Sequence, residues 1–208
     1  EALQAANTNT ELWDGAVPAG SPTETDVIRF AESLFTDGEN PVPGTITLGG
    51  TELAITGNLD IEGPGANLLS INANQLSRVF SIGSGVQATL SGVTITGGSA
   101  TTGGGIRNSG VLTVTNSTIS GNSAMGTSGQ GGGVYNTRTL TVTGSTISGN
   151  SAAGSAGQGG GVYSTGILTV TGSTISGNSA TSGGGVCSNN GLTVINSTIS
   201  GNSASTHG

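Results

Sequence analysis

A single eight-residue block, STISGNSA, recurs four times in this chain and constrains its fold more than any other feature. Its copies occupy residues 117–124, 145–152, 173–180 and 197–204, and a looser copy, VTITGGSA, occupies 93–100. Successive copies are offset by 24, 28, 28 and 24 residues, and each longer offset contains a four-residue insertion. Periods of this size are typical of a solenoid, in which each repeat stacks on its neighbours.

Apolar residues alternate with polar ones inside each unit. Leu112 and Val114 flank Thr113, and the same Leu-Thr-Val-Thr pattern stands at 140–143 and 168–171. Period-two alternation in short segments that end at Gly or Asn indicates brief β-strands with one buried side. Two further segments of the unit carry apolar residues at Ile119, Ile147, Ile175 and Ile199 and at Ile106, Val134, Val162 and Val186.

These patterns predict an all-β parallel β-helix with coils of about 24 residues and three short strands per coil. No coil can bury its Val, Leu and Ile side chains alone, so they must pack on the coils above and below. We expect Val114, Val142 and Val170 inside the solenoid. The intervening threonines, Thr113, Thr141 and Thr169, should lie outside.

An asparagine recurs at an equivalent turn of each unit, at Asn122, Asn150, Asn178 and Asn202. An Asn side chain stabilises a turn by bonding to nearby backbone groups, and identical amides stack well in a repetitive array. We therefore expect a structural asparagine ladder along the axis of the β-helix.

Charged residues are few and unevenly distributed. All eleven carboxylates lie between Glu1 and Glu62, and the only arginines beyond them are Arg78, Arg107 and Arg138. Two thirds of the chain therefore lacks the carboxylates that serve as general acids, general bases or metal ligands. The formal net charge of −7 disfavours nucleic acid and anionic membrane surfaces as partners.

The 208-residue sequence contains one cysteine, Cys187, and one histidine, His207. A single cysteine excludes an internal disulfide framework and a multi-thiolate metal site. A single histidine disfavours histidine-bound metals and Ser-His-Asp catalysis. No apolar run approaches the roughly 18 residues of a membrane-spanning helix. We therefore expect no cofactor, no metal and no transmembrane segment.

The first part of the chain differs from the repeats. Residues 1–9 have Ala, Leu and Gln at helix-compatible spacing, and strands are predicted near 26–30, 45–48, 53–56, 59–61, 68–71 and 78–82. A solenoid needs a distinct cap to shield the end of its core. We assign residues 1–44 to an N-terminal cap with a short helix and the first strands. Residues 45–208 form the β-helix, with regular repeats from about residue 82.

The stretches EALQAAN, DVIRFAESL, TITLGGTELAIT, LDIEGPGANLLSINANQLSRVFSI and SGVTITGG follow one another along the first hundred residues. They resemble the N-terminal region of bacterial CSLREA-domain proteins. The SGNSA…GGGV repeats resemble those of polymorphic outer-membrane proteins and autotransporter passengers. The resemblance covers nearly the whole chain and implies a secreted, right-handed β-helix at the cell surface or outside the cell. By this resemblance the chain starts at the last Glu-Ala of the CSLREA motif and stops where another GGGV coil is expected.

Three functions are compatible with these features, and we favour a non-catalytic extracellular scaffold: a stalk, a surface layer or an adhesive repeat protein. The uncharged repeats, the stacked coils and the family resemblance support this interpretation. The partner would be a surface partner, a glycan or ice. End-to-end or side-by-side self-association is also compatible with a stack of similar coils.

The second function is ice binding. Outward threonines on the strand at 111–115 and its equivalents form pairs about 6.7 Å apart, and successive coils lie about 4.8 Å apart. A flat, uncharged array of hydroxyl and methyl groups can order water, although Thr is also favoured in strands for other reasons. Ile195 interrupts the array, and the neighbouring strand carries Ser at half of its outward sites. The candidate binding residues are Thr113, Thr115, Thr141, Thr143, Thr169, Thr171 and Thr193.

The third function is a polysaccharide-active enzyme. Asp60 and Glu62 lie two residues apart on one predicted strand, and Arg78 follows one coil later. Two carboxylates with an arginine can perform acid-base chemistry on a sugar. Such pairs near a cap are mostly solvated, however, and no histidine, lysine or aromatic platform accompanies them. We therefore assign no catalytic residue and expect no enzyme.

One column combines an arginine, two tyrosines and a cysteine. Arg107, Tyr135, Tyr163 and Cys187 take the same outward position in successive units. The two loops that contain the insertions, MGTSGQ and AGSAGQ, follow the STISGNSA block in consecutive coils and should bulge from one edge. The column is compatible with a weak contact stripe, but we expect it to shield a loop.

Overall fold

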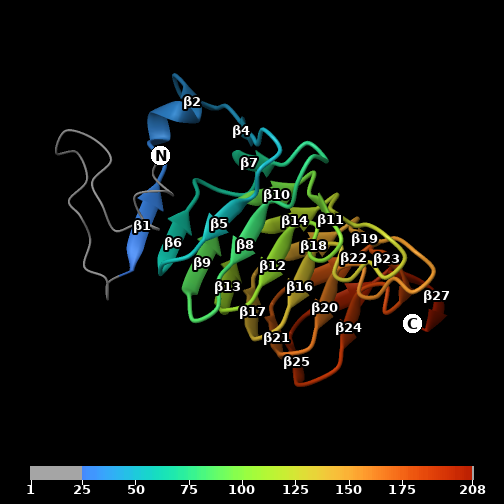
Figure 1. Ribbon diagram of the computed structural model, residues 1–208. Helices are drawn as coiled ribbons and strands as arrows, with labels where there is room; N and C mark the ends of the chain where they lie inside the picture. The colour runs from blue at the N-terminus through green and yellow to red at the C-terminus, as the bar shows by residue number, and fades with distance from the viewer. Residues whose placement is uncertain (1–24, 208) are drawn as a thin grey trace.

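The computed structural model describes residues 25–207, which form a stack of coils whose strands pair side by side. Figure 1 shows the chain advancing from β1 at one end of the stack to β27 at the other. Every strand pair between coils is parallel in this part of the chain, and only β2 and β3 pair antiparallel. The fold is a right-handed, all-β parallel solenoid of about six turns.

Three long sheets run along the stack. We number them 1 to 3 in the order in which the chain passes through them within a coil. Sheet 1 contains β1 (Asp26–Arg29), β6 (Leu59–Glu62), β9 (Gln87–Ser91), β13 (Val111–Thr115), β17 (Thr139–Thr143), β21 (Ile167–Thr171) and β25 (Leu192–Ile195). Sheet 2 contains β4 (Gly44–Thr47), β7 (Leu69–Asn72), β10 (Thr94–Thr96), β14 (Thr118–Ser120), β18 (Thr146–Ser148), β22 (Thr174–Ser176) and β26 (Thr198–Ser200). Sheet 3 contains β5 (Leu53–Ile55), β8 (Phe80–Ile82), β12 (Ile106–Asn108), β16 (Val134–Asn136), β20 (Val162–Ser164) and β24 (Val186–Ser188).

A fourth, narrow sheet lies between sheets 2 and 3. It adds a short fourth strand to the three that were expected in each regular coil. Sheet 4 contains β11 (Ser99–Ala100), β15 (Ser123–Ala124), β19 (Ser151–Ala152), β23 (Ser179–Ser182) and β27 (Ser203–His207). The loops that contain the insertions, 125–130 and 153–158, lie between sheet 4 and sheet 3, and their backbones bond to each other, for example from the Ala156 N–H to the Thr127 carbonyl at 2.9 Å. Isolated bridges connect Thr102, Gln130, Gln158 and Ser182.

Strand alternation fills the interior with aliphatic side chains. On β17, Leu140 and Val142 are fully buried, whereas Thr139, Thr141 and Thr143 face outward and are partly exposed. Val114 of β13 and Val170 of β21 are buried in the same way, so the predicted inward and outward positions are confirmed. Full burial of one such side chain contributes about 1.5–3 kcal/mol, and each contribution needs the coils on both sides.

The turn from sheet 1 to sheet 2 requires a left-handed backbone. The angle φ is 48° at Asn116 and Asn196 and 57° at Gly144 and Gly172, which take this position in successive coils. Gly adopts such angles without strain, and Asn tolerates them better than other side chains do. Backbone geometry therefore explains why either Asn or Gly precedes each STISGNSA block.

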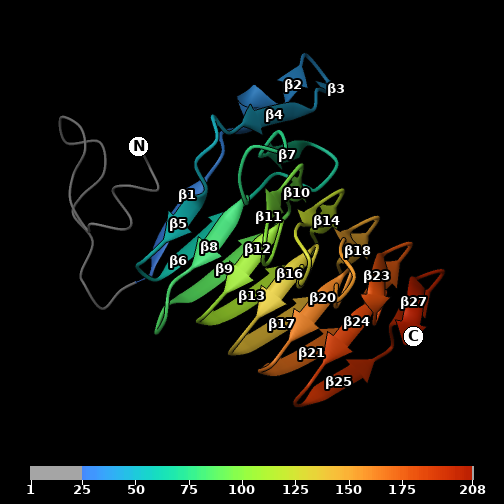
Figure 2. The same ribbon diagram turned by 45° about the vertical axis from the view of Figure 1, so that its right-hand side comes forward.

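The N-terminal part of the described chain departs from the regular coils. β1 pairs in parallel with β6 at the start of sheet 1. A short 3-10 helix, η1 (Glu32–Leu34), then leads into a hairpin of β2 (Thr36–Asp37) and β3 (Asn40–Pro41). Figure 2 shows β2 and β3 beside β4 at the N-terminal end of the stack. The helix expected over 1–9 lies outside the described residues, and the cap boundary at residue 44 stays a prediction.

No helix within the described chain has the length and apolar character needed to cross a membrane.

Candidate functional site

The four candidate asparagines form one column in the turn between sheets 2 and 4. Asn150 Nδ2 donates to Asn178 Oδ1 at 3.0 Å and to the carbonyl of Ile119 at 2.9 Å. Its Oδ1 accepts from the backbone N–H and from Nδ2 of Asn122, both at 3.0 Å. Asn178 continues the column to Asn202 at 2.9 Å. Each inner amide thus has its donors and acceptors occupied and links adjacent coils.

A serine column that we did not predict runs beside the asparagines. Ser117, Ser145 and Ser173 are almost fully buried. The hydroxyl of Ser145 donates to the carbonyl of Thr143 at 2.8 Å and accepts from the backbone N–H of Ser117 at 3.1 Å. The invariant first Ser of each STISGNSA copy was the signal for this column.

A second asparagine column follows sheet 3 and was also missed. Asn108 Nδ2 donates to Asn136 Oδ1 at 2.7 Å, and Asn136 Nδ2 donates to Ser164 Oγ at 2.9 Å. All three side chains are fully buried. The replacement of Asn by Ser at position 164 breaks the identity of the column, so the repeat comparison did not reveal it.

The candidate threonines form two in-register columns on the outer side of sheet 1. Their members are Thr113, Thr141, Thr169 and Thr193 in one column and Thr115, Thr143 and Thr171 in the other. Ile195 continues the second column. A third outward column holds Gln87, Val111, Thr139 and Ile167, of which Val111 and Ile167 are 46% and 55% exposed. From β9 to β25 the strand positions of this face therefore mix hydroxyl, amide and aliphatic groups without a charge, whereas β1 and β6 place Arg29, Asp60 and Glu62 at its N-terminal end.

Sheet 2 presents a narrower face, and its threonine column is as long as the column on sheet 1 that runs from Thr89 to Thr193. Thr residues occupy one outward position in five consecutive coils, at Thr94, Thr118, Thr146, Thr174 and Thr198. The accompanying column changes from Thr96 to Ser120, Ser148, Ser176 and Ser200. The regular strands here have three residues against four or five in sheet 1, so this face holds two outward columns rather than three.

Two of the three residues considered for acid-base chemistry, Glu62 and Arg78, belong to separate ion pairs. Glu62 accepts from Arg29 Nε at 2.7 Å and from Arg29 Nη2 at 3.2 Å. Arg78 pairs instead with Glu52. Asp60 lies on β6 and neighbours Thr89 in the next coil. The hypothesised group of Asp60, Glu62 and Arg78 is therefore divided, because Arg78 lies at the entry to sheet 3 while the carboxylates lie on sheet 1.

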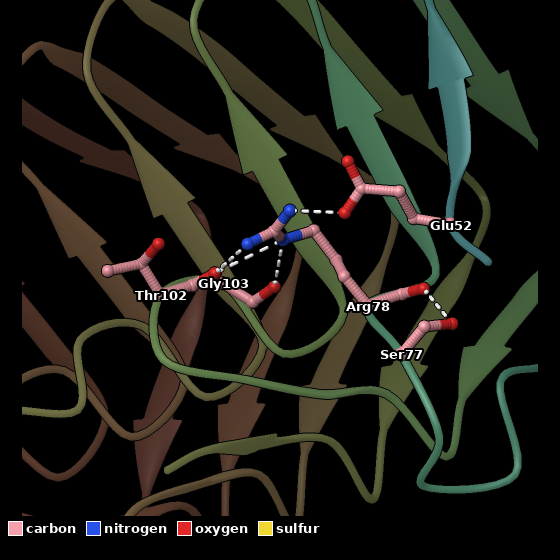
Figure 3. A network of polar contacts seen from close by, with 5 residues as sticks. All are labelled: Glu52, Ser77, Arg78, Thr102 and Gly103. Atoms are coloured by element: carbon pink, nitrogen blue, oxygen red, sulfur yellow. Dashed lines mark hydrogen bonds and ion pairs between the residues drawn. The ribbon is translucent and has the colours of Figure 1, made fainter. Parts of the chain in front are cut away.

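Arg78 is a largely buried link between three successive coils. Figure 3 shows its guanidinium group between the Glu52 carboxylate and the backbone carbonyls of Thr102 and Gly103. The Arg78 Nε donates to Gly103 at 2.9 Å and Nη2 donates to Thr102 at 2.8 Å. Burial lowers the pKa of the Arg78 guanidinium; the Glu52 carboxylate opposes this shift, and the charge of Arg107 adds to it. The side chain is only 12% exposed, so the network acts as a structural clamp.

The column of Arg107, Tyr135, Tyr163 and Cys187 lies in register on the outer side of sheet 3. The tyrosine rings stack with centroids 5.5 Å apart and planes inclined by 11°. The Tyr163 hydroxyl accepts from Asn189 Nδ2 at 2.9 Å, and burial raises its pKa. The two rings pack on each other, and the hydrogen bond from Asn189 attaches Tyr163 to the segment that follows β24. The column therefore has a structural role.

Metal-ligand and thiol chemistry have little support in the described residues. Between residues 25 and 207, no group of three or more His, Cys, Asp or Glu side chains is placed to hold a metal ion. Burial raises the pKa of the Cys187 thiol, which disfavours the reactive thiolate.

The in-register parallel sheets and the internal polar ladders define a β-helical solenoid. The sequence model of the family described as the right-handed β-helix region matches residues 55–207. This match covers well over half of the chain, which therefore belongs to the right-handed β-helix family. No curated protein and no solved structure matches the chain. The family includes pectate-lyase-like enzymes as well as proteins without catalytic activity, so function has to be argued from the site.

The asparagine column predicts a large effect of a small substitution. Asn150→Ala leaves buried partners on Asn122, Ile119 and Asn178 without a hydrogen bond, and each such group costs about 1–3 kcal/mol. We expect the free energy of unfolding, measured by urea denaturation, to fall by about 3 kcal/mol or more. The control is Asn116→Gly, at an exposed position with positive φ, which should change it by less than about 0.5 kcal/mol. Equal effects of the two substitutions would contradict the ladder.

The Arg78 clamp predicts a contrast between two arginines. Arg78→Gln leaves Glu52 and two carbonyls without their partner, so we expect a loss of about 2–4 kcal/mol in the free energy of unfolding. Arg107→Gln, at an exposed site, should lie within about 0.5 kcal/mol of the unchanged protein. Hydrogen exchange should accelerate at β5, β8 and β12 in the first variant only. Uniform acceleration along the chain would refute a local clamp.

Proposed function

We propose that this chain is a non-catalytic extracellular scaffold that presents rigid, hydroxyl-covered faces to its surroundings. The observation that carries the proposal is the continuous register of the strands in sheets 1 to 3, and of the polar columns beside them, from coil to coil. Coils built mainly to stack on one another give length and stiffness. Those properties suit a stalk, a surface layer or an adhesive repeat protein.

The division of the acidic residues supports the non-catalytic part of the proposal. Acid-base chemistry on a sugar needs two carboxylates that flank one bond. Here Glu62 is engaged by Arg29, and Glu52 is engaged by Arg78 at a different place on the surface.

The resemblance to CSLREA-domain and polymorphic outer-membrane proteins supports a location outside the cell. The net charge of −7 argues against nucleic acid as a partner. A surface partner or a glycan fits the neutral faces better, and copies of the chain can also associate end to end or side by side.

The scaffold proposal predicts two results. The purified chain should release no new reducing or unsaturated ends from pectins, alginates or β-glucans. Protease added to intact producing cells should remove the chain, because it is exposed outside them. Turnover that disappears in Asp60→Asn or Glu62→Gln would instead identify an enzyme, and full protection from protease would contradict the location.

Ice binding is a second candidate, and the width of the sheet 1 face favours it. Three outward columns run side by side there, uncharged from β9 to β25, and the threonine pairs repeat over β13, β17 and β21. Spacings of about 6.7 Å along a strand and about 4.8 Å between coils give a flat lattice that can order water. The aliphatic groups of Val111 and Ile167 extend the methyl surface of this lattice.

Substitution of a bulky residue in the centre of the lattice distinguishes ice binding from a scaffold without ice binding. Ice binding predicts thermal hysteresis in the unchanged protein and a large loss in Thr141→Tyr, because one side chain displaces ordered water over several coils. Thr146→Tyr on sheet 2 should matter less. Neither outward substitution should change stability by more than about 0.5 kcal/mol. The absence of hysteresis in the unchanged protein would exclude ice binding, and equal losses would move the site away from sheet 1.

A further inference from the structure

A hollow lies between the first turn of the solenoid and the hairpin, and none of its lining residues belongs to the threonine columns. Its volume is about 410 Å³, within the range of small-molecule sites. Its lining comes from the end of β1, from η1 to β3, and from the turn after β6. We call it the N-terminal hollow, and its defining residues are Arg29, Phe30, Glu32, Phe35, Glu62 and Leu68.

One side of the N-terminal hollow is apolar and fixed in place. The rings of Phe30 and Phe35 meet edge to face, with centroids 6.4 Å apart and planes inclined by 76°. Phe35 is 5% exposed and packs against Gly44, where a β-carbon would approach its ring to 3.1 Å. Leu68 packs on the same core. The wall is therefore supported from behind by the solenoid.

The other side of the hollow carries a neutral pair of charged groups. The two hydrogen bonds between Arg29 and Glu62 orient the guanidinium and carboxylate planes toward each other. Their side chains remain 68% and 45% exposed. The pair uses two of the five N–H donors of the arginine, and each carboxylate oxygen can accept another bond. Donors and acceptors thus lie side by side, and Glu32 adds a further acceptor.

We propose that the N-terminal hollow binds one uncharged sugar residue. A sugar ring has an apolar C–H face, which matches the partly exposed side chains of Phe30 and Leu68, with the buried Phe35 ring behind them. Its vicinal hydroxyls each donate and accept, which matches the adjoining donors and acceptors of Arg29 and Glu62. A simple anion would meet the carboxylates of Glu62 and Glu32, and a simple cation would meet the Arg29 guanidinium.

This site goes beyond the scaffold and ice-binding proposals and does not depend on either of them. The threonine faces repeat from coil to coil, whereas the N-terminal hollow is formed by residues that precede the regular repeats. Binding there would give the chain a single specific contact at one end of a uniform stack.

Saturation-transfer NMR on the full chain tests this proposal. The probes are the methyl glycosides of glucose, galactose, mannose and N-acetylglucosamine, with choline and glucuronate as charged comparisons. We expect saturation of the ring protons of at least one neutral glycoside. Arg29→Ala and Glu62→Ala should each weaken that binding by about tenfold or more, because hydrogen bonds to charged groups are the strong ones. Asp60→Asn, two residues from Glu62 on the same strand and outside the lining, should leave binding unchanged.

Three results would overturn the proposal: no transfer from any neutral glycoside, transfer that survives both alanine variants, or transfer from choline or glucuronate alone. Arg29 and Glu62 are exposed, so an unchanged urea midpoint shows that each variant is folded. The experiment does not involve the threonine faces, and Thr141→Tyr should retain full binding. Loss of hysteresis and loss of sugar binding are therefore distinguishable.

Discussion

Parallel backbone hydrogen bonds between successive coils fix almost every other feature of this molecule. Gly131, Gly132 and Gly133 each donate to the coil that follows, at 2.9, 3.1 and 3.1 Å, and the strands on either side continue the same pattern. Once this register is set, an inward Leu or Val meets an inward Leu or Val, and an outward Thr meets an outward Thr. A coil can then lengthen most easily in a loop between two sheets. Both four-residue insertions lie in such a place, between sheet 4 and sheet 3.

The same register satisfies the polar groups that the turns bury. A buried amide without a partner costs about 1–3 kcal/mol, yet Asn122, Asn150 and Asn178 are almost fully buried. The cost is offset because each amide finds its partners in adjacent coils, where the turn has the same shape. The serine column solves the same problem at the preceding turn, between sheets 1 and 2. Burial and repetition are therefore coupled: a polar side chain can be buried here only because its neighbours repeat it.

The sequence was sufficient to predict whatever depends on repetition. The alternation around Thr113 predicted the buried valines, and the recurrence of Asn122 predicted the column that contains it. The column that contains Asn108 was not predicted, because Ser164 replaces one of its asparagines. The Arg78 clamp escaped for a different reason. Its partners, Glu52 and Thr102, lie 26 and 24 residues away in coils that share no repeated sequence. Their proximity follows from the fold, and no pattern in the sequence reports it.

The difference between repeated and unrepeated coils also explains where charged side chains occur. A charge inside a repeat would stack on the same charge about 4.8 Å away in the next coil, and like charges at that distance repel by about 1 kcal/mol even in water. Repeated coils therefore favour neutral side chains, and their faces suit many weak, identical contacts. The first coils differ from one another, so opposite charges can meet across them, as Arg29 meets Glu62 and Arg78 meets Glu52. Specific recognition is thus easiest to build at this irregular end, and extended contact is easiest along the repeats.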